Sequence, residues 1–332
     1  MNIWQLASPK NLQRAEAPDL KITPETAKVK ITKALLSEAD VASYAGLHKV
    51  ATPLTLGRYA IGQVTEAGEN SFMQKGDRVY FACTTEDELS PDGLKVAGET
   101  VDGFYRDFAL VNADEAYVLP SSVTDEAAFL IDAVALAEKV VDELHVTVGQ
   151  HILVLGGGLY ANVLCQILIY HRAVPILIDN NQERLDRAKK SGIYYTFHFD
   201  ETLQEGILKV TGGKKADGAV YFAFNNRIET SAVFNFLARD TYVAFCALTG
   251  KTLNVNVENA MRNNVTLKGI TECREYVSSA INILANKAVS FGQFPFFTYP
   301  EERLPEKMQE YAQLLTSGIP LPEQMDIFKF IL

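Results

Sequence analysis

The segment His151–Ala161, with the sequence HILVLGGGLYA, constrains the fold of this chain more than any other part. An apolar run leads directly into three glycines and a helix-like apolar stretch follows, which is typical of a strand, a tight turn and a helix. The small residues of this segment match the fingerprint G-x-G-x-x-G/A, whose backbone lets a pyrophosphate approach a helix N-terminus. The pattern predicts a dinucleotide-binding turn with contacts from Gly156, Gly157, Gly158, Leu159, Tyr160 and Ala161.

A second apolar run, Val174–Asp179, indicates which dinucleotide the turn prefers. It ends in a carboxylate 23 positions after Gly156. An acid at that distance can accept a hydrogen bond from a ribose 2′-hydroxyl and repels a 2′-phosphate. The sequence therefore favours NAD(H) over NADP(H), with Asp179, Asn180 and Arg184 as further cofactor contacts.

Composition excludes several classes of function. At 332 residues, with 48% hydrophobic and 22% charged residues, the chain is typical of a globular protein of about two domains. It contains no apolar run of about 18 residues, and its N-terminus lacks the pattern of a signal peptide. The net charge of −10 argues against nucleic acid as a partner, and the four scattered cysteines are typical of a reducing cytoplasm. We expect a cytoplasmic protein with a small-molecule substrate and no membrane partner.

The chain divides into a β-rich part and a part with alternating elements. Alternation and turn residues predict strands near residues 29–36, 61–68, 75–81 and 104–119, whereas the polar stretch 84–100 is expected to be a loop. Helical spacing begins at Thr124 and continues to Leu144, with acidic residues in its first turn. After His151, strands and helices alternate, which predicts a parallel sheet with crossover helices.

This order of elements resembles the medium-chain dehydrogenase/reductase superfamily over nearly the whole chain. The matching pieces are Gly62–Gly68, Lys75–Val79, Asp102–Phe108, Tyr117–Pro120, the glycine turn and Glu183–Gly192. The resemblance implies an α/β fold: a Rossmann doubly wound parallel sheet plus an N-terminal GroES-like β-rich catalytic domain that the C-terminal segment completes. It implies a catalytic domain over residues 1–133, a dinucleotide-binding domain over 134–271 and a return segment over 272–332.

Within the superfamily, Ser37–Asp40 and Asp102–Asn112 are most similar to the polyol and polyol-phosphate branch, including the ribulose-5-phosphate reductases. The family's zinc-binding members hold a catalytic zinc at positions that correspond here to Ser37, Arg58, Tyr59 and Asp132. Zinc needs about three N, S or carboxylate ligands, and an arginine cannot bind a cation. The usual proton relay corresponds to Ala39 and Ala42, and the structural-zinc loop between Cys83 and Asp102 has too few cysteines. The resemblance therefore implies a member without zinc.

The cofactor pocket also differs from the family pattern. Phe224 and Cys246 stand where glycines commonly follow two of the Rossmann strands, and Pro322–Asp326 lacks the basic residue that contacts the pyrophosphate in some members. Bulk and negative charge at these positions weaken dinucleotide binding. These differences motivate the hypothesis of a catalytically inactive binding or partner subunit.

Without zinc, another group must stabilise the charge that develops on the substrate oxygen and supply a proton. Alignment with the family puts the candidates Arg58 and Tyr59 at the vacated metal position. The candidates Tyr44 and His48 fall in the loop that borders the family's substrate cleft, and Lys49 and Asp132 are expected substrate contacts. Each has a simpler interpretation: Arg58 forms an ion pair with Asp132 or Asp40, Tyr44 and Tyr59 pack in the core, and His48 and Lys49 are solvated.

The sequence thus favours a zinc-independent, NAD(H)-dependent oxidoreductase acting on a small alcohol/carbonyl pair, with a polyol or polyol phosphate as one candidate. The alternatives are an enoyl or quinone reductase and the inactive subunit. We also expect a homodimer, because Leu253–Val257 and Val265–Ile270 predict a strand edge able to pair with a second copy.

Overall fold

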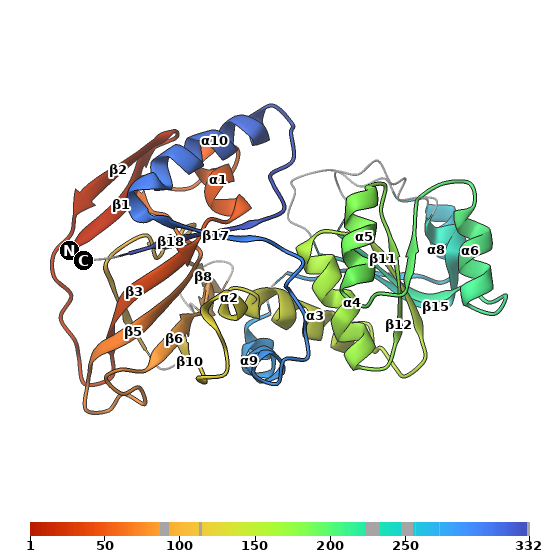
Figure 1. The fold of residues 1–332 in the computed structure, drawn as a ribbon, viewed down its shortest axis with the longest axis horizontal. Helices are drawn as coiled ribbons and strands as arrows, with labels where there is room; N and C mark the ends of the chain where they lie inside the picture. Colours follow the sequence, from red (N-terminus) through yellow and green to blue (C-terminus); the bar gives the residue numbers. More distant parts are fainter. Residues whose placement is uncertain are drawn as a thin grey trace. The chain divides into compact units, whose positions relative to one another are not determined.

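The computed structural model describes residues 1–86, 93–112, 115–222, 233–246, 255, 257–271 and 273–330. The chain folds into two compact units, which are described separately (Figure 1). Unit 1 comprises Met1–Phe129 and Phe294–Leu332, and unit 2 comprises Leu130–Gln293.

Unit 1 is built around β3 (Ala27–Leu35), which pairs with β5 (Tyr59–Ala67), β9 (Phe108–Val111) and β18 (Met325–Lys329), antiparallel in each case. Its alternating sequence buries Ala27, Val29 and Ile31 completely, as the two-residue period of a strand requires. Among the described residues the strand order is β10-β6-β5-β3-β18-β17. The other strands of this order are β6 (Arg78–Phe81), β10 (Ala116–Val118) and β17 (Phe296–Pro300).

Smaller elements complete unit 1. A second sheet has the order β2-β1-β4, with β1 (Asn2–Ser8), β2 (Asn11–Glu16) and β4 (Leu54–Thr55). The expectation of an unbroken loop over 84–100 is wrong, because β7 (Thr84–Glu86) pairs with β8 (Leu94–Val96). The helices are α1 (Glu38–Ala45), α2 (Asp125–Ala128) and α10 (Leu304–Thr316), and α10 packs against α1 (Figure 1). Through α10 and β18 the C-terminal segment completes this unit, as predicted.

Unit 2 contains a parallel sheet with the order β13-β12-β11-β14-β15-β16 in the described part of the chain. This parallel sheet, together with the β-rich unit 1, confirms the predicted α/β fold class. The strands are β11 (His151–Leu155), β12 (Val174–Ile178), β13 (Tyr195–Phe197), β14 (Ala216–Tyr221), β15 (Leu237–Phe245) and β16 (Thr266–Gly269). In Figure 1, α4 (Leu159–Tyr170) and α5 (Gln182–Lys190) cover one face of this sheet, and α6 (Leu203–Val210) and α8 (Val257–Arg262) cover the other.

The boundaries of the units differ from the sequence prediction. The predicted helix over Thr124–Leu144 is divided into α2 and α3 (Ile131–Glu143), and the first boundary lies between them at Phe129 rather than after residue 133. The second boundary lies at Gln293 rather than after residue 271. The reason is a tertiary contact: α9 (Val277–Ala285) packs against α3, so the chain after residue 271 still belongs to unit 2.

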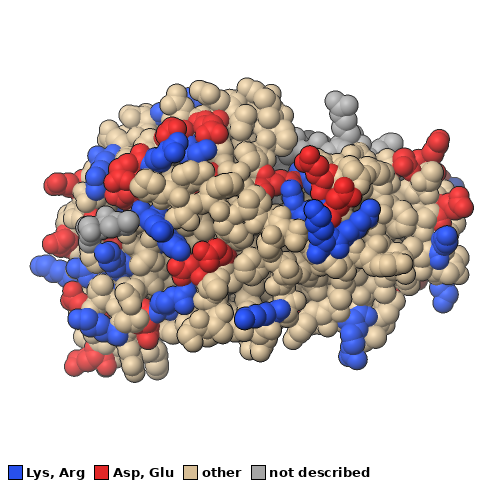
Figure 2. Space-filling view, viewed as in Figure 1, with Lys and Arg blue, Asp and Glu red and all other residues tan. Residues whose placement is uncertain are grey.

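The surface carries charges of both signs. On the face shown in Figure 2, the acidic and basic side chains of the described residues are intermixed over the surface. No helix in the described ranges has both the length and the apolar character needed to cross a membrane.

Candidate active site

The glycine turn of unit 2 follows β11 and starts α4. Gly156 has a φ of +101°, a left-handed conformation that glycine adopts without strain, and its N–H donates to the carbonyl of Ile178, 2.8 Å away. The N–H of Gly157 donates to Asp179 Oδ2 over 2.6 Å. Gly158 is extended and stands at the N-cap of α4, where no side chain caps the helix. The first N–H groups of α4 are therefore not covered by a capping side chain.

The space around these glycines differs from one to the next. A Cβ atom on Gly157 would lie 2.9 Å from Arg184 Cβ, so a larger residue would displace α5 or the turn. A Cβ atom on Gly158 would meet no other heavy atom within 4 Å. Open space beside uncapped N–H groups at the positive end of a helix fits the pyrophosphate of a dinucleotide.

Asp179 is completely buried at the end of β12, and the protein itself engages its carboxylate. Besides the Gly157 contact, Oδ1 accepts from the N–H of Asn181 over 2.7 Å, and Arg184 Nη1 lies 3.3 Å from Oδ2. The side chain of Arg184 is 19% exposed. The predicted cofactor residues Asp179 and Arg184 are thus brought together as an ion pair beside the turn, and Asn180 lies next to them on the surface.

Three other predicted residues also lie in unit 2. Tyr160 donates through its hydroxyl to Asp132 Oδ2 over 2.8 Å, so the expected substrate contact Asp132 is linked to the first turn of α4. Cys246 follows β15, where its N–H donates to the carbonyl of Tyr221, and burial raises the pKa of its thiol to about 12. Phe224 lies outside the described residues.

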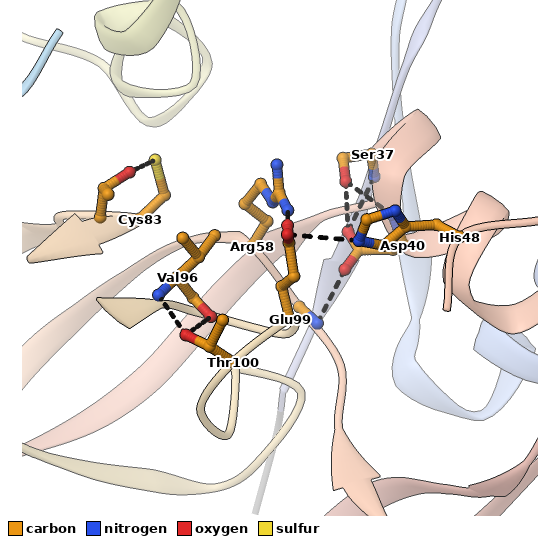
Figure 3. A network of polar contacts seen from close by, with 10 residues as sticks. Ser37, Asp40, His48, Arg58, Cys83, Val96, Glu99 and Thr100 are labelled. Carbon is orange, nitrogen blue, oxygen red and sulfur yellow. Dashed lines mark hydrogen bonds and ion pairs between the residues drawn. The ribbon is translucent and has the colours of Figure 1, made fainter. Parts of the chain in front are cut away.

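In unit 1 the loop that carries Arg58 is fixed by a buried carboxylate. Asp40 is 2% exposed, and its Oδ1 accepts from the N–H of Gly57 over 2.9 Å. Its Oδ2 accepts from the Tyr105 hydroxyl, 3.1 Å away. The same oxygen accepts from the backbone N–H and hydroxyl of Ser37, which caps α1 (Figure 3). Four donors therefore satisfy Asp40, and its role here is to hold Gly57 and hence the backbone of Arg58.

The charge of Arg58 is neutralised by Glu99. The Arg58 Nη2 atom donates to Glu99 Oε2, and His48 Nε2 lies 3.2 Å from the other oxygen, Oε1 (Figure 3). The side chains of Arg58, Glu99 and His48 are 14%, 29% and 46% exposed. Burial acts to lower the pKa of the Arg58 guanidinium, but four neighbours raise it above its ordinary value: Tyr59, Asp40, Glu99 and Cys83. Arg58 is therefore a permanent cation.

The expectation that Asp40 binds Arg58 directly needs correction, whereas the pairing with Asp132, which belongs to unit 2, stays a prediction. Asp40 acts on Arg58 only through its charge, because its oxygens are engaged by Gly57, Ser37 and Tyr105. The ion-pair partner is Glu99, 41 positions from Arg58, and the sequence analysis missed it. Glu99 is one of five acidic residues between Cys83 and Asp102, and no spacing rule singles it out or connects it to Arg58.

The turn that carries Glu99 packs directly on the Arg58 loop. Gly98 has a φ of +71°, and a Cβ atom there would lie 3.1 Å from the Gly57 nitrogen and 3.4 Å from Asp40 Oδ1. Gly57 in turn has a φ of +106°, and a Cβ atom there would lie 2.7 Å from the backbone nitrogen of Tyr105. Two glycines thus allow a backbone approach that brings Glu99 to Arg58.

The remaining candidates divide into buried and exposed residues. Tyr44 is 7% exposed in the core of unit 1, and burial raises the pKa of its hydroxyl. Tyr59 is half-buried as the first residue of β5. His48 and Lys49 are exposed in the loop after α1. Searching the part of the chain that the structure describes finds no cluster of three His, Cys, Asp or Glu side chains able to hold a metal ion.

Comparison with known families agrees with this architecture. Residues 23–121 match the alcohol dehydrogenase GroES-like domain, and residues 161–286 match the zinc-binding dehydrogenase family. The chain belongs to the medium-chain dehydrogenase/reductase superfamily. The first matched range lies in unit 1 and the second lies in unit 2.

Individual members of the superfamily are distant in sequence and close in fold. A sorbitol dehydrogenase from Halalkalibacterium halodurans is 26% identical over 217 residues, which cover 61% of this chain and 63% of that protein. The NADH complex of rspB from Escherichia coli CFT073, described as a short chain alcohol dehydrogenase, superposes with a TM-score of 0.84 at 18% identity over 99% of both chains. Galactitol-1-phosphate dehydrogenase from Escherichia coli has a TM-score of 0.83 at 15% identity, over 99% of this chain and 100% of that one.

Proposed function

We propose that this protein is a zinc-independent, NAD(H)-dependent oxidoreductase that transfers hydride between nicotinamide and a small alcohol/carbonyl substrate, with a polyol as the substrate class. The observation that carries this proposal is the uncapped glycine turn beside Asp179. The similarity to a sorbitol dehydrogenase supports the polyol class. Unpaired thiols such as Cys165 fit the cytoplasm as the compartment.

The residues of the turn fit a nicotinamide dinucleotide. Gly158 and the N-terminus of α4 would hold the pyrophosphate. Asp179, which is buried, would act on the adenosine ribose through the groups that it positions, the Gly157 N–H and Arg184. When bound, the nicotinamide supplies or accepts a hydride. Arg184 would attract the 2′-phosphate of NADP(H), but Asp179 already neutralises its charge. This ion pair supports the preference for NAD(H).

Arg58 is the residue best suited to the charge on the substrate oxygen. It is a cation held in place by Asp40 and Glu99, and a fixed donor stabilises a developing alkoxide without reorganisation. His48 is the most exposed member of its cluster and is proposed to exchange the proton. Tyr59 and Lys49 are proposed as neighbouring substrate contacts.

The test combines metal content with cofactor binding. Elemental analysis of the purified protein is expected to find less than stoichiometric zinc, because Ser37 and Arg58 replace two ligands of the family. NADH fluorescence titration is expected to show tighter binding than NADPH, and a panel of polyols, polyol phosphates and carbonyls should reveal turnover. One tightly bound zinc per chain contradicts zinc independence. Binding of neither nucleotide contradicts the enzyme and favours the inactive subunit.

We further propose a homodimer formed along β16. This strand ends the sheet order of the described residues, and Val257, Met261 and Leu267 nearby are 63%, 76% and 42% exposed. Of the predicted edge segment 253–257, residues 253, 254 and 256 lie outside the described part of the chain. An exposed strand edge with apolar neighbours favours pairing with a second copy. Light scattering at micromolar concentration is expected to give the mass of a dimer, and a monomer contradicts the proposal.

A further inference from the structure

The cation at the candidate substrate site of unit 1 carries its own counter-ion. Arg58 is 14% exposed, and Glu99, which pairs with it, is 29% exposed. Figure 3 shows the Arg58 guanidinium in contact with the Glu99 carboxylate. A group that approaches Arg58 from solvent therefore meets the carboxylate as well as the guanidinium. We propose that Glu99 is a specificity-determining residue, which keeps anionic substrates away from Arg58 and selects uncharged polyhydroxy compounds. This inference rests on the proposed function.

The ion pair is built into the backbone and does not depend on two flexible side chains meeting by chance. Asp40 fixes Gly57 on one side of Arg58, and Gly98 brings the turn with Glu99 against Gly57. Many exposed ion pairs contribute little because side-chain entropy opposes them. Here both backbones are held and both side chains are partly buried, so the pair is present before a substrate arrives.

The chemistry of this pair distinguishes hydroxyl groups from phosphates and carboxylates. A hydroxyl can donate to a Glu99 oxygen and accept from a remaining N–H of Arg58, so it satisfies both partners. A carboxylate or a fully ionised phosphate ester can only accept, and any of these anions must displace Glu99 or lie beside a like charge in a partly desolvated place. The exposed Lys49 is the alternative anchor for an anionic substrate, and the two interpretations predict opposite results.

The first experiment measures binding without turnover, using inorganic phosphate as the probe. The proteins are the full-length wild type, Glu99→Gln, and Glu25→Gln as a control that removes the same charge at an exposed position of unit 1. Phosphorus NMR titration is expected to show that Glu99→Gln binds phosphate about tenfold more tightly than wild type, as the gain of a charge-assisted contact requires. The control should behave as wild type. The double variant Glu99→Gln/Arg58→Gln should lose the gain.

The second experiment uses sorbitol and sorbitol 6-phosphate as a matched pair of substrates. Wild type is expected to prefer sorbitol, and Glu99→Gln is expected to lower KM for the phosphate and raise KM for sorbitol, with smaller changes in kcat. A merely structural role for Glu99 would lower the melting temperature and leave the ratio of the two KM values unchanged.

The outcomes separate this inference from the proposed function. Suppose that wild type turns over no compound of the panel but Glu99→Gln gains phosphate binding through Arg58. The proposed function then fails, whereas the inference that Glu99 keeps anions away from Arg58 stands. Equal phosphate affinity in wild type and Glu99→Gln overturns the inference. Loss of phosphate binding on Lys49→Gln in wild type also overturns it, because the anion site would then be Lys49.

Discussion

The nucleotide turn of unit 2 and the Arg58 cluster of unit 1 each hold an arginine against a carboxylate, but by different means. In unit 2 the pair Arg184–Asp179 lies within one strand–turn–helix segment, and the turn is made by backbone groups. In unit 1 the pair Arg58–Glu99 joins two loops 41 positions apart. The comparison teaches that a site made of backbone N–H groups can be recognised from a short local sequence pattern. A site made of side chains can join residues from distant loops that no motif connects.

The largest effect is expected on the turnover of an Arg58 variant, and it distinguishes a catalytic role of Arg58 from a structural one. Arg58→Ala is expected to lower turnover about a hundredfold or more while NADH affinity is unchanged, as loss of an oxyanion donor does. If Arg58 only neutralises Glu99 and Asp40, the variant should have a lower melting temperature and the folded fraction should keep its turnover. Arg303→Ala, which breaks the exposed pair with Glu306, serves as the control. A variant that is both stable and fully active contradicts both roles.

A smaller effect is expected at the corresponding pair of unit 2. Asp179→Ala should reduce the preference for NADH over NADPH by about tenfold, because Arg184 then becomes available to a 2′-phosphate. Asp179→Asn, which keeps an acceptor for the N–H of Gly157, distinguishes the lost charge from a disturbed turn. Fluorescence titration with both nucleotides measures the ratio. An unchanged ratio in both variants would show that Asp179 has no part in the choice.

The smallest effect is expected at a more exposed ion pair of unit 1. Its loss gives a reference value against which the effects at Arg58–Glu99 and Arg184–Asp179 can be compared. At Asp125, burial acts to raise the carboxyl pKa, but Lys33 and Arg78 lower it below its ordinary value. A lowered pKa means stability that is present above the ordinary value and is lost as pH falls through the lowered one. Asp125→Asn is therefore expected to cost under about 1 kcal/mol near pH 7. The difference in melting temperature from wild type should shrink as the pH falls, and a constant difference contradicts this.

The parts of the fold that sequence could predict are those fixed by local backbone requirements. The strand before Gly156, the turn and α4 follow from glycines and an apolar run, which act over a dozen neighbouring residues. The compact unit extends past the predicted boundary at residue 271 because α9 packs on α3, a contact between segments far apart in the chain. The hairpin of β7 and β8 was missed because each strand has only three residues, and β7 is entirely polar. Such short strands give too few positions for a recognisable alternation.

The same distinction holds for the candidate site. The sequence placed Arg58 and His48 together by resemblance to the family, and the structure joins them through a carboxylate that the family pattern does not contain. Glu99 reaches them only because Gly98 and Gly57 permit close backbone approach, which no residue spacing encodes. Asp40 illustrates the opposite error: its charge made it an attractive partner for Arg58, but its oxygens are used by backbone and hydroxyl donors.

The packing of Gly98 on Gly57 has a consequence for how this chain can evolve. Because the two loops are held together, changing either Arg58 or Glu99 alone leaves a partly buried charge without its partner, which destabilises the protein. A substitution that introduces a metal ligand at position 58 removes the cation that pairs with Glu99, so it lowers stability before any metal is bound. Each single substitution at the pair is expected to lower the stability of the protein, so the ion pair opposes stepwise replacement of either residue.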